Sequence, residues 1–184
     1  SVLGVSGIDR AMAYLVATGT GFRLGELKSL CPENFDLDSD PPTVAVSAAY
    51  SKHRRRDVQP IRIDLAEIIR PWLENKAAGE SVFQLPDKAA RMINVDLRCA
   101  RARWIKEVAS KAQRRLRLKT DFLKTTDHDN RVCDFHALRH TYITRLVRSG
   151  ASVKVCQDLA RHSTPMLTIG RYAHTRLHDL THAL

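Results

Sequence analysis

The alternation of apolar and polar residues predicts a mainly helical chain that also contains one small β-hairpin. Apolar residues recur three or four positions apart in several segments that we expect to be helices, namely residues 8–18, 23–30, 64–76, 95–116, 135–147 and 152–161. Two short apolar runs, residues 43–49 and 58–63, flank a charged turn and predict the strands of a hairpin with a basic tip. The expected fold class is therefore α+β, mainly α-helical, with a small antiparallel sheet or hairpin at one edge.

Glycine, proline and capping residues set the expected ends of these helices. Residues 18–21, Thr-Gly-Thr-Gly, end the first helix. Asp64 and Ser152 are placed to cap the N-termini of two others, and Gly150 is placed to end the helix that precedes Ser152. Pro71 lies inside the helix that starts at Asp64, and we expect it to kink that helix.

Composition and charge narrow the class of protein. The chain has 184 residues, of which 43% are apolar, and this is enough for one globular domain with a sizeable core. The 30 Lys and Arg against 20 Asp and Glu give a formal net charge of +10. That surplus favours a polyanionic partner, with nucleic acid first and a membrane surface second. The sequence shows no signal peptide and no apolar run of membrane-spanning length.

The cysteines indicate the redox environment of the chain, and its first residues indicate whether it is part of a longer protein. Four cysteines are spread along it without a CxxC pair: Cys31, Cys99, Cys133 and Cys156. This spacing favours reduced thiols in a cytoplasmic protein. The sequence opens on Ser-Val-Leu-Gly without an initiator Met, so we expect it to be a fragment of a longer protein.

The densest chemistry lies in residues 136–140, His-Ala-Leu-Arg-His. On a helix, His136, Arg139 and His140 fall at i, i+3 and i+4 and share one face. Another face is apolar and suited to the core: Leu138, Tyr142 and Leu146. An arginine offers phosphate oxygens a planar fork of donors, and a histidine can transfer a proton near neutral pH. We therefore expect this polar face to line a cleft that binds a phosphate.

Two later groups extend this chemistry. Arg161 and His162 form a second Arg-His pair, and Tyr172 follows ten residues after His162. The tyrosine hydroxyl can attack a phosphodiester as a covalent nucleophile. Catalysis of phosphoryl transfer is mostly positioning and electrostatic stabilisation, and this chemistry needs no cluster of metal-binding carboxylates. We therefore expect neither a metal nor another cofactor.

Four segments resemble, in order, the sequence boxes of the tyrosine recombinases, the phage-integrase family. Residues 20–27, Thr-Gly-Phe-Arg-Leu-Gly-Glu-Leu, resemble the first box, TGxRxxEL. Residues 136–141 resemble the HxLRHT box, residues 159–163 the LGHS segment and residues 171–174 the YTH segment. One box alone would be weak evidence. Four in order, with a basic hairpin between the first and the second, are specific, and the resemblance covers essentially the whole chain.

Carried over residue by residue, the resemblance implies a site made of Arg23, Lys52, His136, Arg139, His162 and Tyr172. The two arginines would clamp the scissile phosphate, and the two histidines would bind it and assist proton transfer. The lysine would be the general acid. The tyrosine would be the nucleophile, which forms a 3′-phosphotyrosyl link and frees a 5′-hydroxyl. Glu26 is expected to orient Arg23, and His140 to support the site.

The sequence departs from the family pattern in three places. Arg161 stands where the family usually has Gly before the histidine, which adds charge near the phosphate and changes the backbone preference. Residues 170–171, Gly-Arg, precede the tyrosine where other small or polar residues are common. The hairpin turn offers three arginines, residues 54–56, besides Lys52, so the lysine assignment rests on its place relative to residues 60–61.

Other interpretations of single residues remain open in the sequence. Cys133, His136 and His140 have zinc-like spacing, with His128 or His162 as a fourth ligand, although a lone Cys among arginines makes zinc the weaker hypothesis. Three further tyrosines are rival nucleophiles. Two of them are expected in the core and the third at a strand end: Tyr14, Tyr142 and Tyr50.

The resemblance implies the catalytic domain of a site-specific DNA recombinase, with residues 1–184 forming that single domain and the family's N-terminal DNA-clamping domain absent. Enzymes that share the chemistry, a type IB topoisomerase-like or telomere-resolving enzyme, and a non-catalytic DNA-binding module are the alternatives. The implied partners are double-stranded DNA and further protomers in a tetrameric synapse, in the bacterial nucleoid or on a phage or mobile element. We expect the fragment alone to be monomeric and to bind DNA weakly. Residues 177–184 predict a short amphipathic helix that docks in cis or on a neighbouring protomer.

Overall fold

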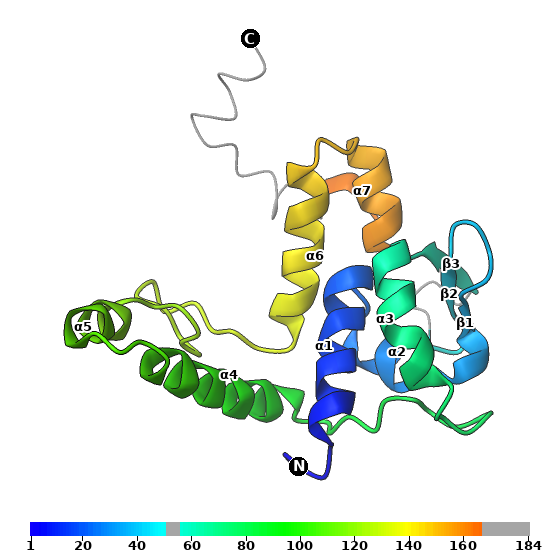
Figure 1. Ribbon diagram of the computed structural model, residues 1–184. Coiled ribbons are helices and arrows are strands. Elements are labelled where there is room, and N and C mark those ends of the chain that lie inside the picture. The colour runs from blue at the N-terminus through cyan, green and yellow to red at the C-terminus, as the bar shows by residue number, and fades with distance from the viewer. Residues whose placement is uncertain (51–55, 167–184) are drawn as a thin grey trace.

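The computed structural model describes residues 1–50 and 56–166 (Figure 1). Its first half contains, in chain order, α1 (Gly7–Thr20), α2 (Leu24–Lys28), the 3-10 turn η1 (Pro32–Asn34), β1 (Phe35–Asp36), β2 (Thr43–Val46), β3 (Asp57–Pro60) and α3 (Ile63–Leu73). Its second half contains α4 (Ala89–Lys106), α5 (Lys111–Lys119), α6 (His136–Arg148) and α7 (Val153–Ala160).

Helix α1 has clear signals at both ends. The Ser6 side chain accepts a hydrogen bond from the Asp9 amide at 3.0 Å and caps the N-terminus. Gly21 ends the helix with a φ of 65°, and its N–H donates to the Ala17 carbonyl at 2.9 Å. The inward face is made of small residues such as Ala13, which lets α6 lie close beside α1 (Figure 1). The helix expected over residues 8–18 is confirmed.

The strands β1, β2 and β3 form an antiparallel sheet in that order, with Val44 opposite Gln59. The predicted hairpin is confirmed, although both of its strands are shorter than expected and β1 adds a third strand beside it. The basic tip, residues 51–55, lies outside the described residues. Burial alternates along β3, so Val58 faces solvent while the polar Gln59 side chain is buried.

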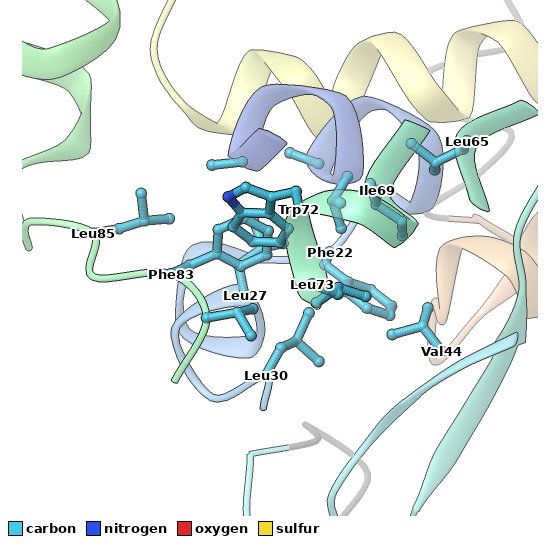
Figure 2. Packing of buried hydrophobic residues seen from close by; sticks show 14 of the residues in the cluster. Phe22, Leu27, Leu30, Val44, Leu65, Ile69, Trp72, Leu73, Phe83 and Leu85 are labelled. Atoms are coloured by element: carbon cyan, nitrogen blue, oxygen red, sulfur yellow. The ribbon is translucent and has the colours of Figure 1, made fainter. Parts of the chain in front are cut away.

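The apolar residues gather in two groups of unequal size. The main core fills the space between α1, α2, the sheet and α3, where Phe22, Ile69, Trp72 and Phe83 are buried (Figure 2). The Trp72 and Phe83 rings stack there with centroids 5.1 Å apart. A smaller group, which we call the α6–α7 cluster, consists of three buried residues: Tyr142, Ile143 and Ala160.

Helix α3 begins one residue earlier and ends earlier than the sequence predicts. Arg62, in extended conformation, is the N-cap, and the Asp64 carboxylate in the first turn accepts hydrogen bonds from the Arg62 guanidinium instead of capping the helix. The expectation that Asp64 caps the helix is therefore wrong. Pro71 lies in the last turn and has no amide to donate to the carbonyl four residues earlier, but helical hydrogen bonding continues to the bond from the Glu74 amide to the Arg70 carbonyl at 3.2 Å, and α3 stops at Leu73.

The single basic helix expected over residues 95–116 is wrong, because two helices occupy this region. The chain leaves α4 at Lys106, and the Ser110 side chain accepts a hydrogen bond from the Gln113 amide to start α5. Arg101 of α4 donates to backbone carbonyls at the end of α5, among them that of Leu118. A tertiary contact therefore supplies partners for helix-end carbonyls that a continuous helix would have satisfied internally. Asp96 of α4 in turn accepts hydrogen bonds from two side chains of α1, Arg10 and Tyr14.

Helices α6 and α7 agree closely with the sequence predictions. Helix α6 ends at Arg148 and is followed by Gly150 with a φ of 78°. The Ser152 side chain accepts a hydrogen bond from the Val155 amide at 3.3 Å and starts α7 as expected. None of the helices within residues 1–50 and 56–166 is long and apolar enough to cross a bilayer.

Candidate active site

Arg23 stands at the start of α2 and is held by the carboxylate of Glu26. The Arg23 guanidinium Nη1 donates to Glu26 Oε1 at 2.8 Å, and the Arg23 amide donates to Glu26 Oε2 at 2.7 Å. The Glu26 side chain is buried, whereas 30% of the Arg23 side chain is exposed. The carboxylate therefore fixes Arg23 from behind while leaving part of its guanidinium group at the surface.

Arg23 and His136 line the same cleft although they are far apart in the sequence. The cleft has a volume of about 540 Å³, and its wall also includes Lys88, Arg98 and Asp134. His136 is exposed at the first turn of α6, and its ring packs edge-on against the ring of His140 with centroids 4.8 Å apart. The cleft thus combines a partly exposed guanidinium and an imidazole with further cationic side chains.

Arg139, on the same helix as His136, points into the protein. It is 3% exposed, and its guanidinium Nη1 and Nη2 atoms donate to the backbone carbonyls of Gly21 and Ala160 respectively. The expectation that His136 and Arg139 line one exposed face is wrong in this respect. Three residues along a helix fall about 60° short of a full turn, which is enough to turn one side chain outward and the other inward. Arg139 links the segment just before Arg23 to the end of α7.

His162 follows the C-terminal end of α7, and the residue before it shapes that end. Arg161 has a φ of 51° and a ψ of 45°, the left-handed conformation that usually favours glycine and costs other residues about 1 kcal/mol. The amides of Arg161 and His162 donate to the carbonyls of Asp158 and Gln157 at 2.9 and 3.0 Å. This double closure ends the helix and fixes the backbone from which the His162 side chain extends.

The Arg161 side chain is buried rather than exposed to a bound phosphate. It is 8% exposed, its Nη2 atom lies 2.6 Å from Glu26 Oε2, and its Nη1 atom donates to Gln59 Oε1. The guanidinium also lies over the Phe22 ring, 4.4 Å from the centroid. Burial lowers the pKa of Arg161, and the charge of Glu26 opposes that effect. The charge of Arg161 is therefore paired with Glu26 inside the protein, a contact that the sequence did not predict.

Gln59 is a site residue that the sequence analysis missed. Its Nε2 atom donates to the Thr20 carbonyl at 2.7 Å and to the Tyr142 hydroxyl at 2.9 Å, while its Oε1 atom accepts from Arg161. A polar residue at an inward position of a strand was the available signal. Through Gln59, the base of the hairpin joins the segments that carry Arg23 and His162.

His162 itself lines a second hollow, at the base of the hairpin. This hollow has a volume of about 640 Å³ and is lined by β3 residues Asp57 and Gln59 together with Arg161, His162 and Ser163. Strand β3, the second strand of the hairpin, therefore lies next to the Arg161–His162 segment. Lys52 and Tyr172 themselves lie outside the described residues, as does the helix expected over residues 177–184.

Gly21 makes the close approach of these segments possible. Besides its positive φ, a Cβ atom at Gly21 would lie 2.4 Å from Cδ1 of Tyr142, nearer than two such atoms can come. Glycine is therefore required here on two grounds, backbone conformation and space. The Thr-Gly pair in the first sequence box has this packing role next to Arg23.

The rival nucleophiles have surroundings that differ from one another. Burial raises the pKa of the Tyr142 phenol to about 12, so its hydroxyl stays protonated near neutral pH. Burial and a hydrogen bond to Asp96 also raise the pKa of Tyr14. Tyr50 is 60% exposed after β2. Tyr142 is buried as the sequence predicts, whereas Tyr14 is half-buried and packs against the main core.

The zinc alternative and the cysteines can also be assessed. Within the part of the chain that the structure describes, no group of three or more His, Cys, Asp or Glu side chains is placed to hold a metal ion, so Cys133, His136 and His140 do not form a zinc site. Burial raises the pKa of the Cys133 thiol. All four cysteines are free thiols, as expected.

Comparison with known proteins places this geometry in a family. The model of the phage integrase family matches residues 5–178. The chain belongs to the phage integrase family. It is 30% identical over 159 residues to the tyrosine recombinase XerD of Vibrio vulnificus, covering 84% of this chain and 45% of the relative. It is 28% identical over 166 residues to XerC of Staphylococcus carnosus, covering 90% of this chain and 49% of the relative. The chain thus spans about half the length of these curated relatives.

Solved structures of the same fold agree. The integrase of transposon Tn1549, in complex with circular intermediate DNA, is 18% identical with a TM-score of 0.61, covering 96% of this chain and 57% of that one. The catalytic domain of bacteriophage HP1 integrase is 21% identical with a TM-score of 0.56, covering 95% of this chain and 80% of that one. The expected fold class, mainly helical with a small antiparallel sheet at one edge, is confirmed.

Proposed function

We propose that the chain is the catalytic domain of a site-specific DNA recombinase that cuts and rejoins double-stranded DNA. The observation that carries the proposal is the position of the buried Arg139 side chain, which contacts the segment before Arg23 and the segment before His162. Membership of the phage integrase family and the recombinase names of the relatives support it. The formal charge of +10 suits a DNA partner.

In this proposal, the scissile phosphate lies over the two arginines, Arg23 and Arg139. Guanidinium groups offer planar donors to the non-bridging oxygens, whose negative charge grows in the transition state. His136 and His162 bind the same phosphate and assist proton transfer. Because the buried Glu26 carboxylate holds Arg23 before DNA arrives, this guanidinium needs little reorganisation at the moment of reaction.

The proposed reaction is a transesterification with balanced bonds and protons. The Tyr172 hydroxyl oxygen attacks the scissile phosphorus and passes its proton to one of the two site histidines, His136 or His162. A bond forms between that oxygen and phosphorus, and the bond from phosphorus to the 5′-oxygen breaks. Lys52 gives a proton to the leaving 5′-oxygen, which becomes a hydroxyl. Attack by a 5′-hydroxyl from a second strand reverses these steps. The phosphotyrosyl link conserves the bond energy, so the reaction calls for no metal and no high-energy cofactor.

A suicide DNA substrate, nicked near the scissile phosphate, tests the nucleophile. The short leaving strand diffuses away after cleavage and traps the covalent adduct, which is measured as a shifted band on a denaturing gel. Tyr172→Phe should remove the adduct, whereas Tyr50→Phe, at an exposed tyrosine after β2, should keep it. An adduct in the Tyr172→Phe protein would disprove the assignment.

The outcome of the chemistry separates recombination from its relatives. A recombinase needs two duplexes and four protomers, whereas a topoisomerase-like enzyme relaxes supercoils on one duplex. We expect products that join two duplexes, and a solution mass that rises from monomer to tetramer when DNA is added. DNA binding by this fragment alone should weaken steeply with salt, because bound phosphates release counterions. Such a protein would act in the cytoplasm, on DNA of the nucleoid or of a mobile element.

A further inference from the structure

Arg161 occupies a position that the proposed reaction does not use, yet its surroundings connect it to two residues of the site. One connection runs through its side chain, which shares the Glu26 carboxylate with Arg23. Glu26 Oε1 accepts from Arg23 Nη1 at 2.8 Å, and Glu26 Oε2 lies 2.6 Å from Arg161 Nη2. The carboxylate is thus held between two guanidinium groups, one buried and one partly exposed to the cleft.

This shared carboxylate has a geometric consequence for Arg23. The Arg23 amide also donates to Glu26 Oε2 at 2.7 Å, so Arg23 alone contacts both carboxylate oxygens, and Arg161 adds a buried charged donor to Oε2 from the other side. With donors on both sides, the carboxylate keeps a single orientation. Arg161 is itself fixed by Gln59 Oε1 and by the Phe22 ring, which is 4.4 Å from its guanidinium carbon. The chain of contacts from Gln59 through Arg161 and Glu26 therefore ends on the guanidinium of Arg23.

The second connection runs through the backbone. Arg161 takes the left-handed conformation that closes α7, with a φ of 51°. The amide of the next residue, His162, donates to Gln157 O at 3.0 Å, and the Gln157 side chain donates back to His162 O at 3.2 Å. The side-chain contacts of Arg161 thus anchor the same peptide that sets the direction of His162.

We propose that Arg161 is a positioning residue for strand cleavage, which fixes Arg23 through Glu26 and His162 through the closure of α7. The inference rests on the proposed function, because it concerns the rate of that reaction. An arginine at this position fills the role with its side chain and its backbone together. A glycine would supply the backbone conformation alone.

Arg161→Gly separates the two roles, because glycine adopts the left-handed conformation freely while the guanidinium is lost. The experiment is single-turnover cleavage of the nicked DNA substrate, in which the amplitude reports the folded, active fraction and the rate constant reports positioning. We expect DNA affinity to change little and the cleavage rate constant to fall about 10-fold to 100-fold. Arg161→Lys keeps the charge but cannot reach Glu26 and Gln59 together, so we expect an intermediate rate. Arg70→Ala, which removes a guanidinium from an exposed ion pair with Asp38, is the control and should cleave at the wild-type rate.

A substrate with a methylphosphonate at the scissile position distinguishes positioning of the arginine clamp from a purely structural role, which would give the same defect on both substrates. This group lacks one charged oxygen, so the arginine clamp contributes less to the transition state. On this substrate, wild-type and Arg161→Gly proteins should cleave at rates within about a factor of three. An equal defect on both substrates, or a loss of amplitude with an unchanged rate constant, would overturn the positioning role.

The outcomes also distinguish this inference from the proposed function. If the wild-type protein forms no adduct on the nicked DNA, the recombinase proposal fails and the inference fails with it. If the wild-type protein cleaves and Arg161→Gly cleaves at the same rate, only the inference fails. If Arg161→Gly does not fold, the cleavage rate constant of Arg161→Lys tests the inference instead. A wild-type rate constant in Arg161→Lys would show that simultaneous contact with Glu26 and Gln59 is not needed and would overturn the positioning role.

Discussion

The two buried groups of the molecule are built in different ways. The main core joins α1, α2, the sheet and α3 through large apolar side chains such as Phe22, Ile69 and Trp72 (Figure 2). The α6–α7 cluster has only Tyr142, Ile143 and Ala160 as its buried members among the described residues. Besides the packing of α6 on α1, polar contacts tie the α6–α7 end to the body.

The polar ties explain why the candidate site lies where it does. Three polar contacts cross from one part to the other: the hydrogen bonds from Arg139 to the Gly21 carbonyl and from Gln59 to the Tyr142 hydroxyl, and the ion pair between Arg161 and Glu26. A typical hydrogen bond adds only about 1 kcal/mol of net stability, because water competes for both partners, but it defines direction far better than apolar contact does. The main core therefore contributes most of the stability, and the polar joint contributes the geometry of the site.

Matched substitutions at two isoleucines with no exposed surface test this contrast most strongly. Ile69→Ala in the main core should lower the free energy of unfolding by about 4 kcal/mol, because the surrounding side chains cannot close the cavity. Ile143→Ala in the α6–α7 cluster should cost about 2 kcal/mol, because a small cluster relaxes around the loss. Urea denaturation measures both values. Equal losses would show that α6 and α7 belong to the main core energetically.

Hydrogen exchange refines the same comparison. In the Ile143→Ala protein, amides of α6 and α7 should exchange faster while those of α3 keep their protection, because the loss falls on a locally opening unit. Faster exchange throughout the protein would contradict a separate α6–α7 unit.

A substitution at Gly21, where the end of α1 meets the Tyr142 ring of α6, should have the next largest effect. Gly21→Ala must accommodate both the φ of 65° and a Cβ atom 2.4 Å from the Tyr142 ring, and we expect a loss of about 3 kcal/mol. Gly79 has a φ of 75° but nothing within 4 Å of a new Cβ, so Gly79→Ala isolates the backbone strain at about 1 kcal/mol. Thermal or urea unfolding compares the two, and similar losses would mean that the Tyr142 ring moves aside without cost.

The smallest effect concerns a charged contact at the edge of the main core. Asp9 accepts hydrogen bonds from Trp72 Nε1 at 2.9 Å and from Lys76 Nζ at 2.7 Å. Burial works against the charged form of Asp9, but hydrogen bonds from Lys76, Ser6 and Trp72, together with the Lys76 charge, outweigh it and lower its pKa from 3.8 to about 2. A carboxyl whose pKa is lower in the folded state stabilises the protein above its unfolded pKa, and this contribution fades as the pH falls from about 5 to 2.

Asp9→Asn should therefore lower stability near neutral pH by about 1 kcal/mol, a value reduced for the solvent that reaches this partly exposed group. The difference from the wild-type protein should shrink toward zero near pH 2, which urea denaturation at several pH values would measure. A difference that stays constant with pH would show that the contact acts through packing rather than through the charge of Asp9.

The success of the sequence predictions depends on how local their causes are. The C-terminal end of α1 and the start of α7 were predictable because Gly21 and Ser152 act within a few residues of themselves. The single helix expected over residues 95–116 was wrong because the cap at Ser110, which starts α5, was overlooked, and the contacts of Arg101 at the far end of α5 cross from another helix. The inward direction of the Arg139 side chain was also not predicted. A charged residue at the edge of an apolar helix face can turn inward when backbone carbonyls of other segments accept its hydrogen bonds.

The sequence by itself determined the order of the helices, the hairpin, the basic charge and the four boxes that lead to the phage integrase family. These follow from residue type and short-range spacing, which need no knowledge of the folded neighbours. Only the tertiary structure decided that Gln59 is a site residue, that Arg139 bridges two segments and that Arg161 pairs with Glu26. Each of these depends on which donors and acceptors meet when distant segments pack, because a buried polar group left without a partner costs stability.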